Sequence, residues 1–221
     1  MTANYIGIDG CRSGWVIAKA SAKQVSIYLA PTLNNRFKST DVIVIDMPVI
    51  LPKSIEEYPR QSDKAAKKIL KRYHGSIFYA PLATWLAMDY MAINDICFEN
   101  QKPKLSKQSF NLFERIKDVQ TFLTQNLINI NESHPELFFR HYDFHLASKK
   151  TTIGQNVRRQ ILDDAIEKYQ IKIPWHDFKY FQKSKASLLK WDDVLDALAM
   201  MVVAIKMHKA HDFLLKNHLI F

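Results

Sequence analysis

The run Asp41-Val42-Ile43-Val44-Ile45-Asp46 decides the fold class of this sequence. Its four central residues are all apolar, and the run is closed by Asp46 and then by Pro48. A strand without polar residues on either side is buried on both faces, which is typical of the parallel centre of an α/β sheet. We therefore expect an α/β protein in which this run is a central strand.

Four further runs are expected to form strands. Tyr5 to Ile8, Trp15 to Ala18 and Val25 to Leu29 open the chain and are rich in β-branched and aromatic residues. The run Leu127 to Glu132 comes much later and ends at a carboxylate. Together with the central run, these segments predict five strands.

Helical patterns occupy most of the remaining chain. The expected helices are Ser62 to Tyr73, Leu82 to Ile93, Ser106 to Leu127, one that begins at Pro135, Gln155 to Tyr169, and Asp192 to about Leu215. The basic, aromatic segment through Trp175 and Tyr180 is expected to be a loop whose aromatic side chains are buried. Since no repeat or linker divides the sequence, we expect a single domain over residues 1–221 with a helical insertion at about 60–126.

The composition restricts the class and the location of the protein. Of the 221 residues, 48% are hydrophobic and 24% are charged, which excludes a mainly disordered chain. The formal charge of +9 favours polyanionic partners, nucleic acid first. Cys11 and Cys97 do not make a disulfide framework, and Met1 to Tyr5 shows no signal-peptide pattern. The apolar run Val194 to Ile205 is too short to span a bilayer, so we expect a soluble, cytoplasmic protein without a membrane partner.

Several carboxylates stand where expected strands end or where the last helix begins. They are Asp9, Asp46, Glu132 and the cluster of Asp192, Asp193 and Asp196. Ligands of an open α/β sheet gather at the carboxyl ends of its strands, so acids that are distant in sequence can meet there. Crowded carboxylates repel one another unless they share protons or hold a cation, and oxygen ligands suit Mg²⁺ or Mn²⁺. Each acid alone is better explained as a helix cap, a turn residue or a solvated charge, and only their recurrence at strand ends favours a metal site.

A set of ordered motifs carries a family resemblance. The motifs are Gly7-Ile8-Asp9-Gly10-Cys11-Arg12-Ser13-Gly14-Trp15, Ile45-Asp46-Met47-Pro48, Arg60-Gln61-Ser62-Asp63, Ser76-Ile77-Phe78-Tyr79-Ala80-Pro81, Glu132-Ser133-His134-Pro135-Glu136, Ser148-Lys149-Lys150-Thr151-Thr152-Ile153-Gly154 with Arg158, and Asp192-Asp193-Val194-Leu195-Asp196-Ala197-Leu198-Ala199. From Gly7 to Ala199 the chain resembles the domain of unknown function 429 family, which is described as predicted nucleases. The last motif is also similar to the closing helix of RuvC-type resolvases.

The resemblance implies an RNase H-like fold. In that fold a mixed five-stranded sheet, with three antiparallel strands followed by two parallel ones, is flanked by helices. A terminal helix carries catalytic acids. The five strands expected from the residues have a compatible order.

Our first hypothesis is a metal-dependent nuclease that hydrolyses phosphodiester bonds of DNA or RNA by a two-metal-ion mechanism. Asp9, Asp46, Glu132 and Asp193 would hold two Mg²⁺ or Mn²⁺ ions about 4 Å apart. Asp196 would be a further ligand, or would orient one. One ion would activate water and the other would stabilise the leaving 3′ oxygen, and Asp9 would bridge the two. These five acids are the expected catalytic residues.

Two other functions are open. A non-catalytic domain that binds nucleic acid or phosphate, or regulates another activity, could retain the same fold and keep its carboxylates as a metal site without turnover. An actin-like sugar kinase shares a Gly-x-Asp-Gly opening, but it needs two glycine-rich phosphate loops, and this chain has only five glycines. The sequence therefore favours the nuclease and keeps the binding domain as the alternative.

Four basic residues are expected to bind phosphate groups of a nucleic acid: Arg12, Lys149, Lys150 and Arg158. Arg12 follows the first acid, Asp9, within the same motif, and the other three follow the fifth expected strand. The alternative for them is a solvated loop and helix surface. His134 lies between acids, and we expect a hydrogen bond to hold it at a helix start rather than a metal ion.

Overall fold

The computed structural model describes residues 4–33, 37–126 and 128–209. Three segments named above lie outside these described residues: Met1 to Ala3, Leu127 at the start of the expected fifth strand, and residues 210–215 of the expected last helix. The chain divides into two compact units, of which Met1–Met47 with Phe122–Phe221 form the first and Pro48–Thr121 the second. The second unit overlaps the helical insertion expected at about 60–126.

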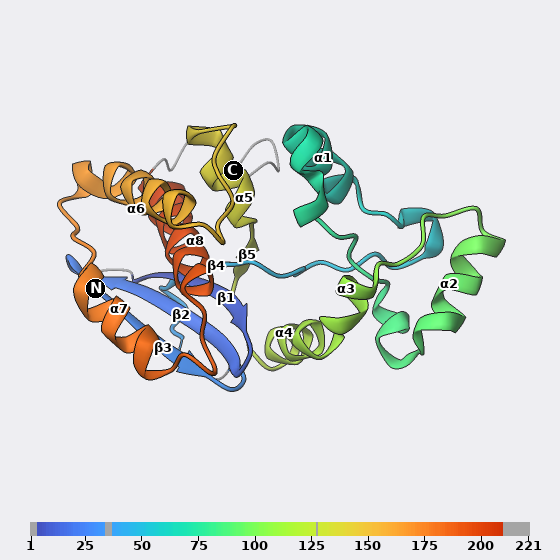
Figure 1. Cartoon of the computed structure of the whole chain (residues 1–221). Helices are drawn as coiled ribbons and strands as arrows, with labels where there is room; N and C mark the ends of the chain where they lie inside the picture. Colours follow the sequence, from blue (N-terminus) through green and yellow to red (C-terminus); the bar gives the residue numbers. More distant parts are fainter. Residues whose placement is uncertain (1–3, 34–36, 127, 210–221) are drawn as a thin grey trace. The chain divides into compact units, whose positions relative to one another are not determined.

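The first unit contains a mixed five-stranded sheet (Figure 1). Its strands are β1 (Tyr5–Cys11), β2 (Gly14–Ser21), β3 (Gln24–Ala30), β4 (Val42–Ile45) and β5 (Ile130–Glu132). Their order across the sheet is β3-β2-β1-β4-β5. The first three strands are antiparallel, whereas β4 is parallel to both β1 and β5. This arrangement confirms the expected α/β class and the expected strand directions.

The strand β4 is buried as its apolar sequence predicts. Ile43, Val44 and Ile45 are inaccessible to solvent, and the strand lies between β1 and β5. Because β1 and β4 run in parallel, their carboxyl ends lie at the same edge of the sheet. Their pairing ends at Ile8 and Ile45, so the next residues, Asp9 within β1 and Asp46 after β4, are neighbours.

The helix α8 (Trp191–Lys209) packs directly on the sheet. Its contacts are with β1, β4 and β2, and the segment Val194–Ile205 is almost completely buried. Gly7 in β1 allows this close approach, since a Cβ atom there would come within 2.0 Å of the backbone nitrogen of Met201. Over the described part of the chain, no helix is both long enough and apolar enough to cross a membrane.

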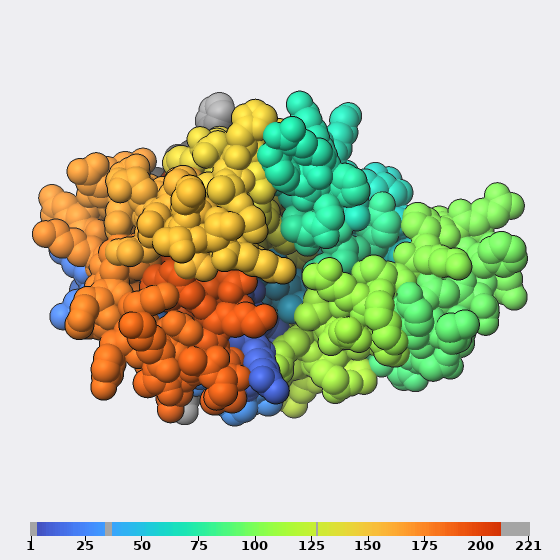
Figure 2. All heavy atoms as spheres, in the orientation of Figure 1, coloured from blue at the N-terminus to red at the C-terminus, as the bar shows by residue number. Residues whose placement is uncertain are grey.

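Three other helices of the first unit pack against α8. They are α5 (Pro135–Tyr142), α6 (Thr152–Ile166), which continues into the 3-10 turn Glu167–Tyr169, and α7 (Trp175–Ser184). In Figure 2 the atoms of α5, α6, α7 and α8, coloured yellow to red, hide most of the blue strands from this side. The core of the first unit lies between this helical layer and the sheet.

The second unit is helical throughout its described secondary structure. Its elements are η1 (Ile55–Glu57), α1 (Gln61–Leu70), η2 (Lys71–Ser76), η3 (Ala83–Ala87), α2 (Tyr90–Glu99), α3 (Lys107–Asn111) and α4 (Phe113–Gln125), whose last turn belongs to the first unit. Two of the family motifs meet here, because Asp63 pairs with Arg60 and also accepts the backbone N–H of Ala80 at 3.0 Å.

Three helix predictions were wrong in extent or type. The segment expected to be a loop forms α7, which buries Phe178 and leaves Tyr180 exposed. The helix expected from Leu82 starts only at Tyr90, because Asp89 caps it by accepting two backbone N–H groups. The single helix expected over 106–127 is divided at Leu112 into α3 and α4.

Candidate functional site

Asp9 and Asp46 lie side by side at the carboxyl ends of β1 and β4. The parallel register pairs Ile8 with Ile45, and the backbone N–H of Asp46 donates to the carbonyl oxygen of Ile8 at 2.9 Å. The two carboxyl groups are close enough for each to affect the pKa of the other. Burial raises the pKa of both groups, and the charge of Asp46 raises the pKa of Asp9 further.

The helix α8 adds two acids to this pair. After burial and Asp46, the charges of Asp196 and Asp193 are the next causes of the raised pKa of Asp9, so acids from three elements interact. Asp196 is 3% exposed, and its Oδ1 has no hydrogen-bond partner among the described residues. Asp193 also has a capping role, because its Oδ2 accepts the backbone N–H of Lys190 at 2.9 Å.

Glu132 and His134 complete the acidic edge of the sheet. Glu132 ends β5 and is paired with Ile45 in the parallel register. Besides the effect of burial, the charge of His134 lowers the pKa of Asp46 and that of Glu132 raises it. The Nδ1 of His134 accepts the backbone N–H of Glu136 at 3.1 Å, so His134 caps α5 in the way expected for a helix-start histidine.

One lysine ammonium lies among these carboxylates. The Nζ of Lys149 is 2.5 Å from Asp196 Oδ2 and 3.9 Å from Asp192 Oδ2. Burial lowers the pKa of Lys149, but the surrounding carboxylates, Asp196 foremost, outweigh burial and raise it. Burial raises the pKa of Asp196 to about 6 although Lys149 opposes the shift. The ammonium therefore compensates only part of the negative charge of the site.

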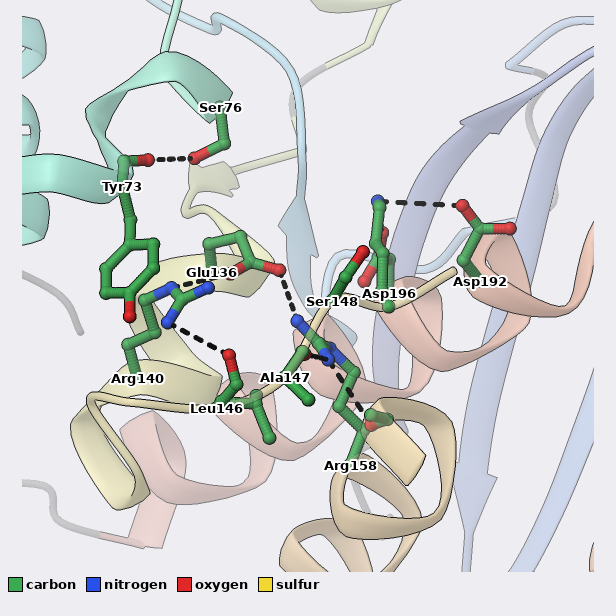
Figure 3. Close-up of polar contacts among 12 residues, drawn as sticks. Tyr73, Ser76, Glu136, Arg140, Leu146, Ala147, Ser148, Arg158, Asp192 and Asp196 are labelled. Carbon is green, nitrogen blue, oxygen red and sulfur yellow. Dashed lines mark hydrogen bonds and ion pairs between the residues drawn. The ribbon is translucent and has the colours of Figure 1, made fainter. Parts of the chain in front are cut away.

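A buried ion network holds the segment that carries Lys149 (Figure 3). Glu136 accepts from Arg158 at 2.6 Å and from Arg140 at 2.8 Å. The same guanidinium groups donate to backbone carbonyls of the segment, Arg158 to Ala147 and Arg140 to Phe144, both at 2.8 Å. The network thus connects α5 and α6 to the segment 143–149 and fixes the backbone on which Lys149 is placed.

The four basic residues expected to bind phosphate lie in different environments. Arg12 and Lys150 are exposed, and Arg12 approaches the carbonyl oxygen of Ser187 at 3.5 Å. Lys149 is among the acids. Arg158 differs from the expectation, because it is 1% exposed and its guanidinium is committed to Glu136 and to backbone carbonyls. These contacts give Arg158 a structural role, and its guanidinium would have to leave them to reach a phosphate group.

Sequence reasoning missed the residues that support the site. Glu136 and Arg140 are four residues apart on α5, a spacing that predicts an ion pair on one helical face. That signal was available. The contact of Glu136 with Arg158, and the position of Lys149 between acids of α8, join segments far apart in the sequence and follow from no local pattern.

Comparison with known proteins identifies the family of this chain. The family model described as "Protein of unknown function (DUF429)" matches residues 7–213. The chain belongs to this family. A search of curated proteins and a search of solved structures found no match. The DUF429 match confirms the family resemblance of the motifs, and any function has to be argued from the site itself.

The donors of this DUF429 site suit a hard divalent cation. Asp9, Asp46 and Asp196 supply only oxygen atoms, which Mg²⁺ and Mn²⁺ prefer. The buried Oδ1 of Asp196 would gain a partner from a cation. In the described residues, however, no three or more Asp, Glu, His or Cys side chains are arranged as a metal-binding group. The donor chemistry therefore fits a metal ion, while the arrangement in the structure has the Lys149 ammonium beside Asp196.

Proposed function

We propose that this protein is a metal-dependent nuclease that hydrolyses phosphodiester bonds of nucleic acid. One observation carries the proposal: the buried carboxylates of Asp9 in β1 and Asp196 in α8 interact with the half-buried carboxylate of Asp46, after β4, at the carboxyl edge of the sheet. Ionised carboxylates at such close quarters are unfavourable without a positive charge. The Oδ1 of Asp196, buried without a hydrogen-bond partner in the described structure, supports a cation there.

Asp9 and Asp46 are the central pair of the acidic cluster, and the other acids flank them. Asp9 interacts with Asp46, Asp196 and Asp193, which supports the proposal that Asp9 would help to hold the Mg²⁺ or Mn²⁺ ions. Asp46, Asp193 and Glu132 would hold the ions from β4, α8 and β5, and Asp196 would complete the site. When bound, such ions supply an activated water and stabilise the charge on the leaving oxygen.

The basic residues at the same edge would position the substrate. Arg12 is exposed directly after β1, and Lys150 is exposed next to Lys149. Their charges, with the overall surplus of +9, favour contact with the phosphate backbone of either DNA or RNA. The cysteines Cys11 and Cys97 are buried thiols without a disulfide, which supports the proposal that the protein acts in the reducing cytoplasm.

The experiment is a panel of labelled single-stranded, duplex, hybrid and four-way-junction substrates, incubated with Mg²⁺, Mn²⁺ or chelator. We expect cleavage that needs the metal and that is lost in Asp9→Asn. The matched control is Asp164→Asn, since Asp164 is exposed on α6 and bonds only to Gln160 among the contacts resolved. Cleavage that survives in Asp9→Asn, or that persists in chelator, would contradict the proposal.

A non-catalytic domain that binds nucleic acid or phosphate is the second candidate. The ammonium of Lys149 beside Asp196 favours it, because an internal positive charge lets acids coexist without a metal ion. This candidate predicts binding to the substrate panel with no cleavage in any metal. The same panel therefore separates the two functions.

A further inference from the structure

The backbone around Lys149 is held in place on both sides. Its carbonyl oxygen accepts from the side chain of Gln155 at 3.0 Å, and the preceding Ala147 accepts from Arg158. Gly154 at the start of α6 lies so close that a Cβ atom there would come within 2.1 Å of the carbonyl oxygen of Ser148. The position from which the lysine side chain extends is therefore fixed.

The side chain itself has freedom that its backbone lacks. It is 36% exposed, whereas the Asp196 side chain that it contacts is 4% exposed. A lysine carries its charge at the end of a flexible stem of four carbons. The ammonium can therefore leave the acids toward solvent by rotation of side-chain bonds, with no movement of the segment 143–149.

The ammonium lies where a cation would be bound. It is in contact with Asp196 Oδ2 and lies 3.9 Å from Asp192 Oδ2. A divalent ion beside the same oxygen atoms would repel a lysine ammonium strongly, because two positive charges a few ångströms apart in a buried site are poorly screened. The two cations cannot share the position.

We propose that Lys149 is the resident cation of this site, that its ammonium marks a divalent-ion position beside Asp196 and Asp192, and that metal binding requires Lys149 to withdraw. This inference rests on the proposed metal-dependent function and adds two elements to it. Asp192 becomes a ligand, and Lys149 becomes a competitor of the metal instead of a simple phosphate contact.

The first test is Mn²⁺ binding by isothermal titration calorimetry to the wild type, Lys149→Met and Lys150→Met. Methionine keeps an unbranched stem of four heavy atoms and removes the charged amino group. We expect Lys149→Met to bind Mn²⁺ about tenfold more tightly or better, since the competing charge is gone. Lys150→Met is the matched control and should bind like the wild type, because Lys150 is the exposed neighbour.

The second test uses the wild type alone, so it does not depend on the folding of a variant. Amine acylation followed by mass spectrometry compares the labelling rates of Lys149 and Lys150 in chelator and in saturating Mn²⁺. An ammonium held by carboxylates reacts slowly, because the deprotonated amine is the reactive form. We expect slow labelling of Lys149 in chelator and a rate close to that of Lys150 once Mn²⁺ is added.

The outcomes separate this inference from the proposed function. The inference would be overturned if the wild type and Lys149→Met bind Mn²⁺ with equal affinity, or if saturating Mn²⁺ leaves the labelling rate of Lys149 unchanged. In either case, metal-dependent cleavage by the wild type would leave the proposed function in place. Absence of both Mn²⁺ binding and cleavage in every variant would overturn the proposed function and this inference with it.

Discussion

The substitution Glu136→Gln tests the buried network that places Lys149. Glu136 accepts from Arg158 and Arg140 at 2.6 and 2.8 Å, and the side chains of the two arginines are 1% and 7% exposed. Glutamine keeps the shape and one acceptor oxygen but leaves two buried guanidinium charges without their carboxylate. Removing one partner of a buried ion pair costs about 3–5 kcal/mol, and we expect a loss near the lower end, about 3 kcal/mol, because one acceptor remains.

The assay is urea denaturation at neutral pH, followed by tryptophan fluorescence and circular dichroism. The control is Glu114→Gln, because Glu114 forms an exposed pair with Lys117 whose loss should cost less than about 1 kcal/mol. If Glu136→Gln lowers the free energy of unfolding by less than about 1 kcal/mol, the role of the network is refuted, since the loss of a buried ion pair costs more than this.

The pH dependence of this effect has a defined sign. Burial raises the pKa of Glu136, but Arg158 and Arg140 outweigh burial and lower it. A lowered pKa means that the stabilisation is complete above the ordinary glutamate value of about 4.3 and is lost as the pH falls through the lower value of the folded protein. The difference between wild type and Glu136→Gln should therefore shrink on acidification, and a difference that grows would contradict the reasoning.

Three further predictions concern the site and its scaffold. Asp196→Asn should change the stability of the chelated protein at neutral pH by less than about 1 kcal/mol in thermal unfolding, because relief of the buried carboxylate charge, whose pKa is raised, offsets the loss of its ion pair with Lys149; a loss of about 3 kcal/mol or more would count against the crowded-acid account. Gly7→Ala should destabilise by about 3 kcal/mol in urea by pushing α8 away from β1, whereas Gly10→Ala, whose Cβ would meet only the side chain of Met47 at 3.8 Å, should cost less than about 1 kcal/mol. Arg12→Ala with Lys150→Ala should weaken nucleic-acid binding alike for all sequences and flatten its salt dependence in fluorescence anisotropy, and an unchanged salt slope would exclude them as phosphate contacts.

The sheet was predictable because the apolar residues of its strands indicate that these segments are buried. Val42 to Ile45 is apolar throughout and is the parallel strand between β1 and β5. The helix α7 was missed although Trp175, Phe178 and Phe181 recur at intervals of three residues, the spacing of one helical face, and pack toward the core. Because that segment is rich in lysine and aromatic residues, we interpreted it as a loop, although its aromatic residues have helical spacing.

The candidate site was only partly predictable. The acids Asp9 and Asp46 were found because parallel strands end at one edge, a rule that needs no knowledge of contacts. The places of Lys149 and Arg158 depend on how the segment 143–149 lies between α6 and α8, and both residues belong to one basic sequence motif. In the structure Lys149 is a cation of the site and Arg158 is a buried residue of the scaffold. Their positive charge alone does not distinguish these two roles.

The most direct test of the central claim is the rate of phosphodiester cleavage by wild type and Asp9→Asn at the same millimolar Mn²⁺ concentration, on the substrate of the panel that the wild type cleaves best. The account predicts that Asp9→Asn falls to the rate of the wild type in chelator while it still binds the substrate. Equal rates in Mn²⁺, or a wild type that cleaves no substrate of the panel in Mg²⁺ or Mn²⁺, would contradict it.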